Sequence, residues 1–256
     1  MSDAHDAPAD LGAGFSQYFE FLPALDEASR QEVYRIRHEV YCRDLGWEPV
    51  RDDGLEQDEF DAQSIHCLLR RKGTGEPVGC TRLILRKAGP GSEPLPFEHH
   101  CDKALHRHLV DPAQLPPDQQ AEVSRLAVMR NYRQRKGEQE AALPMSDDDF
   151  ASRGPQSRFP YIPVGLYLGV ASIAVRLGRE YVFVLTEPRL ARHFSRIGFA
   201  IDTVGDPIEH RGLRAPSLLR ASQFLAHLRP SIQPLYEVID ASVVAAFAAH
   251  PEAGRA

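Results

Sequence analysis

The strongest candidates for chemistry are charged side chains that stand inside apolar segments. Glu122 and Arg125 lie three positions apart in Glu122-Val-Ser-Arg-Leu-Ala-Val128, a segment otherwise suited to a β-strand. Strict alternation would send the two side chains to opposite faces, whereas a β-bulge between them would bring both to one face. A carboxyl group in apolar surroundings can have a raised pKa and act as a general base. Glu122 is therefore a candidate base, and a structural ion pair is the alternative.

A second arginine and an acidic stretch could extend this charged group. Arg82 stands among apolar and β-branched residues and needs a partner if it is buried. Asp58 and Asp61, in the acidic stretch 48–63, are its natural partners. The alternatives are a solvated acidic loop and an edge arginine that extends into solvent. A basic and aromatic segment precedes the acidic stretch and contains Arg37, Tyr41 and Trp47.

Other clusters point to chemistry less strongly. Ser124 lacks the GxSxG motif of a serine hydrolase. A short basic run could bind a phosphate or form a solvated loop, and consists of Arg130, Arg133, Arg135 and Lys136. A histidine-rich segment matches no strong zinc spacing, so we expect no metal site there; it contains His99, His100, Cys101, His106 and His108.

The composition is that of a globular protein with no strong charge excess. The 256 residues include 30 Lys+Arg and 36 Asp+Glu, and 43% are hydrophobic. The net charge of −6 argues against nucleic acid as the main partner. Four separated cysteines form no disulfide scaffold and favour a reducing compartment. No apolar run approaches the ~20 residues of a membrane helix, and the first ten residues lack signal-peptide features, so we expect a cytoplasmic protein.

The elements that must position these side chains form one domain. We expect residues 1–15 to be a disordered tail, and 16–256 to be a single domain with a mobile loop at about 131–163. The order of strands and helices predicts a mixed α/β sheet. The expected strands are 18–22, 65–70, 77–85, 121–129, 181–185 and 200–204. The expected helices are 27–45, 101–109, 164–177, 188–196, 216–227 and 241–249.

Taken together, the charged segments resemble the acyl-homoserine-lactone synthases, which are acyltransferases of the GNAT fold. The pattern is Arg37…Tyr41…Leu45-Gly-Trp47, Glu56-x-Asp58-x-x-Asp61, Gly79-x-x-Arg82-Leu and Glu122-x-Ser-Arg125-Leu. The chain resembles more closely the PEP-CTERM/exosortase-associated acyltransferases, regarded as N-acyl amino acid synthases. That second likeness rests on Ser64-x-His66, Tyr132-Arg-x-Arg135, Glu187-Pro-x-Leu-Ala-Arg192 and Arg211-Gly-Leu-Arg-x-Pro216. The resemblance covers roughly residues 18–240.

The resemblance implies a GNAT-like fold, a mixed central sheet with splayed strands flanked by helices. It implies transfer of a fatty acyl group from an acyl carrier protein or CoA thioester to the amine of an amino acid. The acyl-phosphopantetheine thioester would be a co-substrate between the splayed strands, with no permanently bound cofactor. The chain lacks the glycine-rich phosphate loop of acetyl-CoA-dependent relatives, which favours acyl carrier protein as partner. The alternatives are a lactone synthase that uses S-adenosylmethionine and a non-catalytic acyl-binding module.

The resemblance also implies roles for individual residues. The catalytic group would be Glu122, Arg125 and Asp61. Phe97 would line the acyl tunnel, and Arg82 or Arg125 would hold the acceptor carboxylate. The acceptor pocket would be formed by Arg37, Tyr41, Trp47, Asp58 and Arg82. The donor would be bound by Leu126, Ala127, Val128, Arg133, Arg135 and Lys136.

Overall fold

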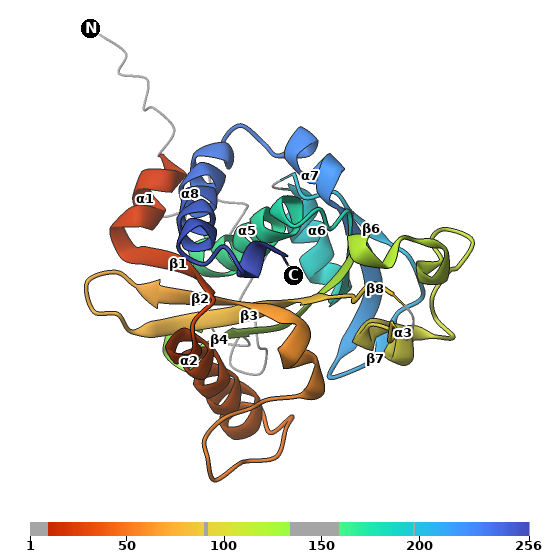
Figure 1. The fold of residues 1–256 in the computed structure, drawn as a ribbon, viewed down its shortest axis with the longest axis horizontal. Coiled ribbons are helices and arrows are strands. Elements are labelled where there is room, and N and C mark those ends of the chain that lie inside the picture. The colour runs from red at the N-terminus through yellow and green to blue at the C-terminus, as the bar shows by residue number, and fades with distance from the viewer. Residues whose placement is uncertain (1–9, 90–91, 134–158, 197, 256) are drawn as a thin grey trace, which may run out of the picture.

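The computed structural model describes residues 10–89, 92–133, 159–196 and 198–255, and one mixed sheet runs through its middle (Figure 1). Every adjacent strand pair is antiparallel except β4–β5, which is parallel. The strand order is β1 (Phe19–Ala24), β2 (Ser64–Arg71), β3 (Pro77–Leu85), β4 (Gln120–Val128), β5 (Tyr181–Thr186), β8 (Leu213–Arg220) and β6 (Ile201–Thr203), with β7 (Ile208–Glu209) paired to β8.

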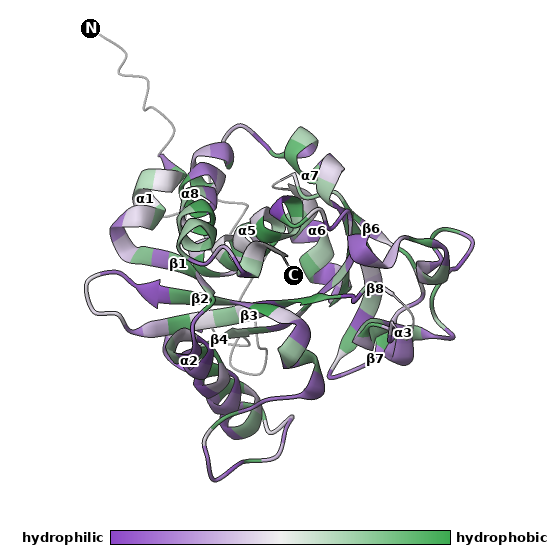
Figure 2. Ribbon diagram, viewed as in Figure 1, coloured by the Kyte–Doolittle hydropathy of each residue, from purple (hydrophilic) through white to green (hydrophobic). Residues whose placement is uncertain are grey.

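Helices cover both faces of this sheet. One face packs against α1 (Leu11–Tyr18), α5 (Tyr161–Arg176), α6 (Pro188–Arg196), α7 (Ala221–His227) and α8 (Gln233–Ala249). The opposite face packs against α2 (Glu27–Arg37), a π-helix (His38–Asp44) and α3 (Pro96–Cys101). The two layers differ in character, because hydrophilic residues gather along α2 whereas α8 is mainly hydrophobic (Figure 2). No helix in these described ranges is long and apolar enough to cross a membrane.

Helix α5 connects the two parallel strands and is the buried centre of its layer. It is apolar nearly all round, as expected for a helix enclosed by the sheet and by other helices. Gly169 lets the helix approach the sheet closely, since a Cβ atom there would lie 2.0 Å from the ring of Phe21. Because of this crossover, the N-terminal parts of β4 and β5 pair with each other.

The same two strands separate at their ends, as the GNAT resemblance implies. Pairing joins Gln120–Val123 to Tyr181–Val184 and stops there, although β4 continues to Val128. On its other side β4 carries a bulge: Arg82 pairs with Ser124 and Cys80 with Ala127, so β4 has one extra residue. Arg125 in this bulge has a φ of 53°. Of the two arrangements considered for Glu122 and Arg125, strict alternation and a bulge, the structure shows the bulge.

Besides the last helix, which was expected at 241–249 and begins earlier, at Gln233 of α8, five expectations on secondary structure need correction. Residues 11–15 belong to α1, which Asp10 caps by accepting hydrogen bonds from two backbone N–H groups. The helix expected to reach residue 45 is α-helical only to Arg37 and continues as a π-helix. The helix expected at 101–109 lies earlier, at α3. Most of the loop expected at 131–163 lies outside the described residues, but Tyr161 already begins α5.

The fifth correction concerns residues 216–227. Pro216 was expected to begin a helix, but Leu213–Arg220 form β8 and only Ala221–His227 are helical. This strand pairs with β5 on one side and β6 on the other, and its middle residues are buried. A short apolar run buried in this way cannot be distinguished from a helix by its periodicity.

Candidate active site

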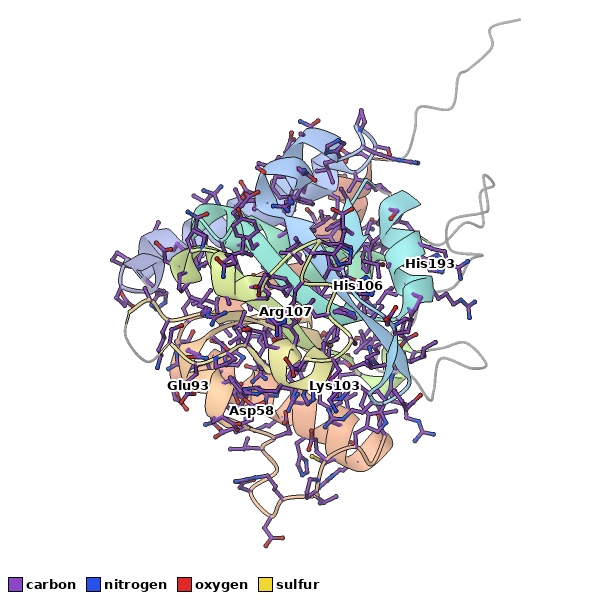
Figure 3. The ribbon with its side chains drawn as sticks, turned by 90° about the vertical axis from the view of Figure 1, so that its right-hand side faces the viewer. Asp58, Glu93, Lys103, His106, Arg107 and His193 are labelled. Atoms are coloured by element: carbon purple, nitrogen blue, oxygen red, sulfur yellow. The ribbon has the colours of Figure 1, made fainter. Side chains whose placement is uncertain are left out.

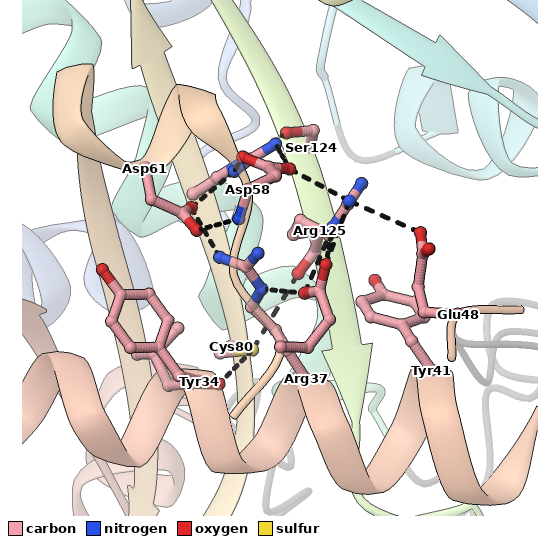
Figure 4. Close-up of polar contacts among 12 residues, drawn as sticks. Tyr34, Arg37, Tyr41, Glu48, Asp58, Asp61, Cys80, Ser124 and Arg125 are labelled. Atoms are coloured by element: carbon pink, nitrogen blue, oxygen red, sulfur yellow. Dashed lines mark hydrogen bonds and ion pairs between the residues drawn. The ribbon is translucent and has the colours of Figure 1, made fainter. Parts of the chain in front are cut away.

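Three arginines from three different elements meet three carboxylates from one loop on the α2 face of the sheet (Figure 4). The arginines come from α2, β3 and the bulge of β4, and the carboxylates come from the loop before β2. Figure 3, which labels Asp58, shows this loop beside the α2 layer, away from His193 on α6. We call this group the charge network; it consists of Arg37, Arg82, Arg125, Glu56, Asp58 and Asp61.

Arg82 is the most enclosed member of the charge network. Its side chain is 2% exposed, and its Nη2 donates to Asp58 Oδ2 at 2.8 Å. Its Nη1 donates to both Asp58 and Asp61, and its Nε donates to Ser124 Oγ at 2.9 Å. Each of the three guanidinium nitrogens therefore already has a partner within the protein. The expectation that Arg82 binds the acceptor carboxylate is not supported by this geometry.

Arg37 and Arg125 complete the charge network, although Arg37 Nη2 is buried without a hydrogen-bond partner. Arg37 Nη1 donates to Asp61 at 2.6 Å, and its Nε donates to Glu56. Arg125 Nη2 lies 3.1 Å from Glu56 Oε1 and 3.0 Å from Asp58 Oδ2. Burial disfavours the ionised form of Asp61, but the hydrogen bond and charge of Arg37 outweigh it and lower its pKa to about 2. The charge network therefore holds three cations against three carboxylates.

Glu122 lies next to this network but has a different environment. The side chain is buried, and its Oε2 accepts a hydrogen bond from the backbone N–H of Phe97 at 2.8 Å. The Phe97 ring stacks on Phe183 with centroids 4.2 Å apart, which fixes that N–H. Burial raises the pKa of Glu122 to about 8, although the Phe97 N–H and nearby arginines favour the ionised form. A carboxyl group with this pKa can exchange a proton near neutral pH.

A pocket lies where β4 and β5 separate, and Glu122 lines it. Its walls include β4 residues 122–126 and β5 residues 184–187, together with Tyr167 of α5. Its mouth is lined by Trp47, by His100 and by the hairpin between β7 and β8. We call this cavity the strand-gap pocket. An extended ligand lying between the splayed strands could therefore reach the Glu122 carboxyl.

The structure brings together three of the residues predicted for the acceptor and two of those predicted for catalysis. Tyr41, Trp47, Arg82, Glu122 and Arg125 all line the strand-gap pocket. The Tyr41 and Trp47 rings stack with centroids 5.8 Å apart, and Tyr41 Oη donates to the carbonyl of Leu126 at 2.8 Å. Two predicted acceptor residues, Arg37 and Asp58, belong to the charge network rather than to the pocket lining, as does Asp61. Phe97 contributes through its backbone N–H.

The predicted donor residues are only partly gathered. Leu126 lines the strand-gap pocket, whereas Ala127 and Val128 are buried and paired with β3. Arg133 is buried beside Asp44, with which it forms an ion pair, and is not among the residues that line the pocket. Arg135 and Lys136 lie outside the described residues.

Sequence reasoning missed several residues of the site. Glu56 stands in the same acidic stretch as Asp58 and completes the charge network, so the local charge pattern could have indicated it. The others were given no role in the site, although Glu48 begins the same acidic stretch, His100 lies in the histidine-rich segment, and the rest lie in or beside the motifs that carry the resemblance. They are Glu48, His100, Glu187, His210, Arg211 and Arg214.

Comparison with known proteins agrees with this architecture. A model of the acetyltransferase (GNAT) domain matches residues 36–141. An acyl-homoserine-lactone synthase of Vibrio anguillarum is 31% identical over 70 residues, which are 27% of this chain and 35% of that protein. One of Pseudomonas fluorescens is 33% identical over 90 residues, 34% of this chain and 45% of that protein. The chain thus matches less than half the length of these curated relatives.

Solved structures match over most of the chain but at low identity. The crystal structure of TofI in a ternary complex with an inhibitor and MTA has a TM-score of 0.55 at 22% identity, covering 84% of this chain and 98% of TofI. FeeM, an N-acyl amino acid synthase from uncultured soil microbes, has a TM-score of 0.52 at 13% identity, covering 83% and 96%. The chain therefore has the GNAT-type acetyltransferase fold, and it is similar to the acyl-homoserine-lactone synthases and to FeeM.

Proposed function

We propose that this protein is an N-acyltransferase that moves a fatty acyl group from a phosphopantetheine thioester to the amine of an amino acid. The observation that carries the proposal is the position of Glu122. It is a buried carboxyl group with a pKa of about 8, and it faces a pocket opened by the separation of β4 and β5. A proton acceptor at the end of a strand gap is the arrangement that an amine-acylating enzyme requires.

The strand gap suits a thioester donor. Within the described residues, β4 has no strand partner on its β5 side beyond Val123, so backbone groups there can bind the amides of a pantetheine arm, apart from the Leu126 carbonyl, which accepts from Tyr41. The donor is an acyl carrier protein or CoA, and we favour the carrier protein because the chain lacks a glycine-rich phosphate loop. Leu126 lies on the bulged part of β4 at the pocket, where a backbone N–H can stabilise the oxyanion.

The reaction needs one proton to be removed from the amine. The neutral amine attacks the thioester carbonyl, a C–N bond forms, and the C–S bond breaks to release the thiol. Glu122 accepts the proton, directly or through a water, and the departing sulfur takes a proton in return. Because about a tenth of a carboxyl group with a pKa of 8 is ionised at pH 7, Glu122 is available as a base near neutrality. No covalent acyl-enzyme is needed.

A second candidate is a lactone synthase that uses S-adenosylmethionine. It is favoured by the curated relatives, which are acyl-homoserine-lactone synthases. The two reactions share the first step, acylation of an α-amine, and differ in whether the product then closes into a ring. The product therefore separates the two candidates.

The test is mass spectrometry of lipid extracts from cells that express the protein, with Glu122→Gln as the control. New N-acyl amino acids that appear only with the parent protein would support the proposal and name both the chain and the acceptor. Acyl lactones together with methylthioadenosine would support the second candidate instead. A folded protein that yields neither product, even with purified acyl carrier protein thioesters, would refute both.

A further inference from the structure

An acceptor amino acid carries a carboxylate, which needs a cation at the strand-gap pocket. The three arginines of the charge network already face three carboxylates, and Arg82 has a partner at each guanidinium nitrogen. Displacing one of those carboxylates would leave a buried charge without its partner, which is costly. A cation outside the charge network is therefore better placed to bind the acceptor carboxylate.

The turn between β7 and β8 supplies two further cations. Arg211 and Arg214 both line the strand-gap pocket. Arg214 holds the turn itself, since its Nε donates to the carbonyl of His210 at 3.0 Å and its Nη2 lies 3.4 Å from the carbonyl of Arg211. Arg211 is more accessible, with a side chain that is 28% exposed. Its guanidinium is therefore the one that can change partners without unfolding the turn.

Arg211 is aimed at the pocket by its backbone and by its neighbours. Its φ is 53°, and among the described non-glycine residues only Arg125 shares a left-handed conformation. Both of these arginines line the strand-gap pocket. The Arg211 guanidinium lies 5.8 Å from the centroid of the Trp47 ring and forms an ion pair with Glu48. Glu48 also lies 3.5 Å from Arg125, so one carboxylate is shared between two cations.

The mouth of the pocket is electrostatically positive. The rings of His100 and His210 lie 4.2 Å apart beside Arg211. Burial together with the charges of His100, Arg211, Arg214 and Arg125 lowers the pKa of His210 to about 4. Burial, the largest cause, disfavours a charge of either sign, whereas the charges of the three arginines favour an anion at this place. In the structure, the carboxylate of Glu48 is the anion that pairs with Arg211.

We propose that Arg211 binds the carboxylate of the acceptor, which replaces Glu48 as its partner. This inference rests on the proposed function and assigns its acceptor class: an α-amino acid with a free carboxylate, whose amine then points towards Glu122. Arginine suits this role because its guanidinium can bind a carboxylate through two parallel hydrogen bonds. Amines that lack the carboxylate, such as amino acid amides, would be poor acceptors.

The kinetic test uses Arg211→Gln and the acceptor found in the lipid extracts. Loss of a charged hydrogen bond predicts a KM for that amino acid about tenfold to a hundredfold higher, with kcat little changed. The KM for the corresponding amide should not change, and Arg211→Lys should restore part of the affinity. Arg192→Gln is the matched control: Arg192 is exposed and lines the neighbouring groove but not this pocket, so the acceptor KM should stay the same.

Glu48→Gln distinguishes between two roles of Arg211, binding the acceptor carboxylate and forming a purely structural ion pair with Glu48. If Glu48 competes with the acceptor, its removal lowers the acceptor KM, opposite to the effect of Arg211→Gln. If the two substitutions impair the protein alike, or if Arg211→Gln raises the KM for amino acid and amide equally, the inference is wrong.

A binding measurement keeps this inference independent of catalysis. Trp47 is the only tryptophan in the chain, so its fluorescence reports on the face that Arg211 covers. A mixture of the natural amino acids without tryptophan should change that fluorescence in the parent protein and not in Arg211→Gln, while a mixture of their amides should change neither. A response to amino acids without acyl transfer would refute the proposed function and retain the carboxylate site. Equal responses to both mixtures, or an unaltered response in Arg211→Gln, would refute the site.

Discussion

Replacing Glu122 by glutamine should change how the stability of the protein depends on pH. The folded protein holds a proton on this buried carboxyl group up to about pH 8, whereas the unfolded chain releases it near 4.5. Between these two values the folded state binds more protons than the unfolded state, so the free energy of unfolding falls as pH rises. The contribution is fully present below about pH 4.5 and is lost by the time the pH has passed 8.

The size of the effect follows from the two pKa values. At about 1.36 kcal/mol for each tenfold change in the acid constant, raising the pKa from 4.5 to about 8 costs the folded state up to about 5 kcal/mol once the group is ionised. This is a large part of the ~5–15 kcal/mol that stabilises an ordinary domain. Glutamine keeps an oxygen for the Phe97 N–H but buries an amide without a known partner, which costs about 1–3 kcal/mol at every pH.

Urea unfolding of both proteins between pH 5 and pH 9 measures this difference. The parent protein should be the more stable of the two at the acidic end, and the variant should equal or exceed it at the basic end. Glu187→Gln is the matched control, because it removes a carboxylate that lines the same pocket but is 43% exposed. Parallel pH profiles for the parent protein and Glu122→Gln would refute the assignment of the buried proton to Glu122.

The same titration should appear in the kinetics. A base is active when it is ionised, so acyl transfer should rise with pH, reach half its maximum near pH 8 as Glu122 loses its proton, and level off about one pH unit higher. The Glu122→Gln variant should lose most of the activity at all pH values while remaining folded. Full activity in this variant would remove Glu122 as the base.

Further substitutions test the scaffold around the pocket. Arg82→Met should lower the free energy of unfolding by about 1.5–3 kcal/mol, measured in urea, because Asp58 and Asp61 lose a shared cation and keep only Arg125 and Arg37, respectively; a folded variant with only a raised acceptor KM would contradict this. Tyr41→Phe removes the hydrogen bond to the Leu126 carbonyl, so it should cost about 1 kcal/mol and lower kcat as the bulge of β4 loosens; unchanged kcat would exclude that coupling. Gly169→Ala should cost about 1–3 kcal/mol, seen as a lower Tm, since its Cβ overlaps Phe21; an unchanged Tm would show that the ring moves freely.

Local sequence patterns correctly predicted the helices and strands whose ends are marked by residues next to them in the sequence. The bounds of β3 and α6 coincide with the expected ones, because turn residues and prolines mark their ends. The bulge in β4 was one of the two arrangements considered for two charged residues three positions apart in one strand. By contrast, β8 was mistaken for a helix, since its apolar run is explained only by the strands on either side of it. The π-helix after Arg37 had no recognised signal.

For the candidate site, too, the sequence predicted which residues take part better than it predicted how they are arranged. The charge network follows from carboxylates and arginines in segments that the sequence already marked as unusual. Its closed arrangement was not predictable, because whether an arginine has a free hydrogen bond depends on which carboxylates reach it in space. The contribution of Arg211 was also hidden, since residues 209–212 contact the pocket only through the pairing of β7 with β8.

The charge network and the strand-gap pocket have different roles in the site: the network stabilises the end of β4, and in the proposed reaction the pocket binds the substrates. Where β4 separates from β5, the backbone groups on that edge of β4 lose their strand partners. The position of this part of β4 must then be fixed by contacts on its β3 edge and on the α2 face. The end of β4 is held in this way: Thr81 Oγ1 donates to the Ser124 carbonyl at 3.1 Å, and Arg125 enters the charge network. The opposite side of the strand then stays open for a ligand. Changes within the network should therefore appear first as losses of stability, whereas changes at Glu122 and Arg211 should appear as changes in kcat and in the acceptor KM.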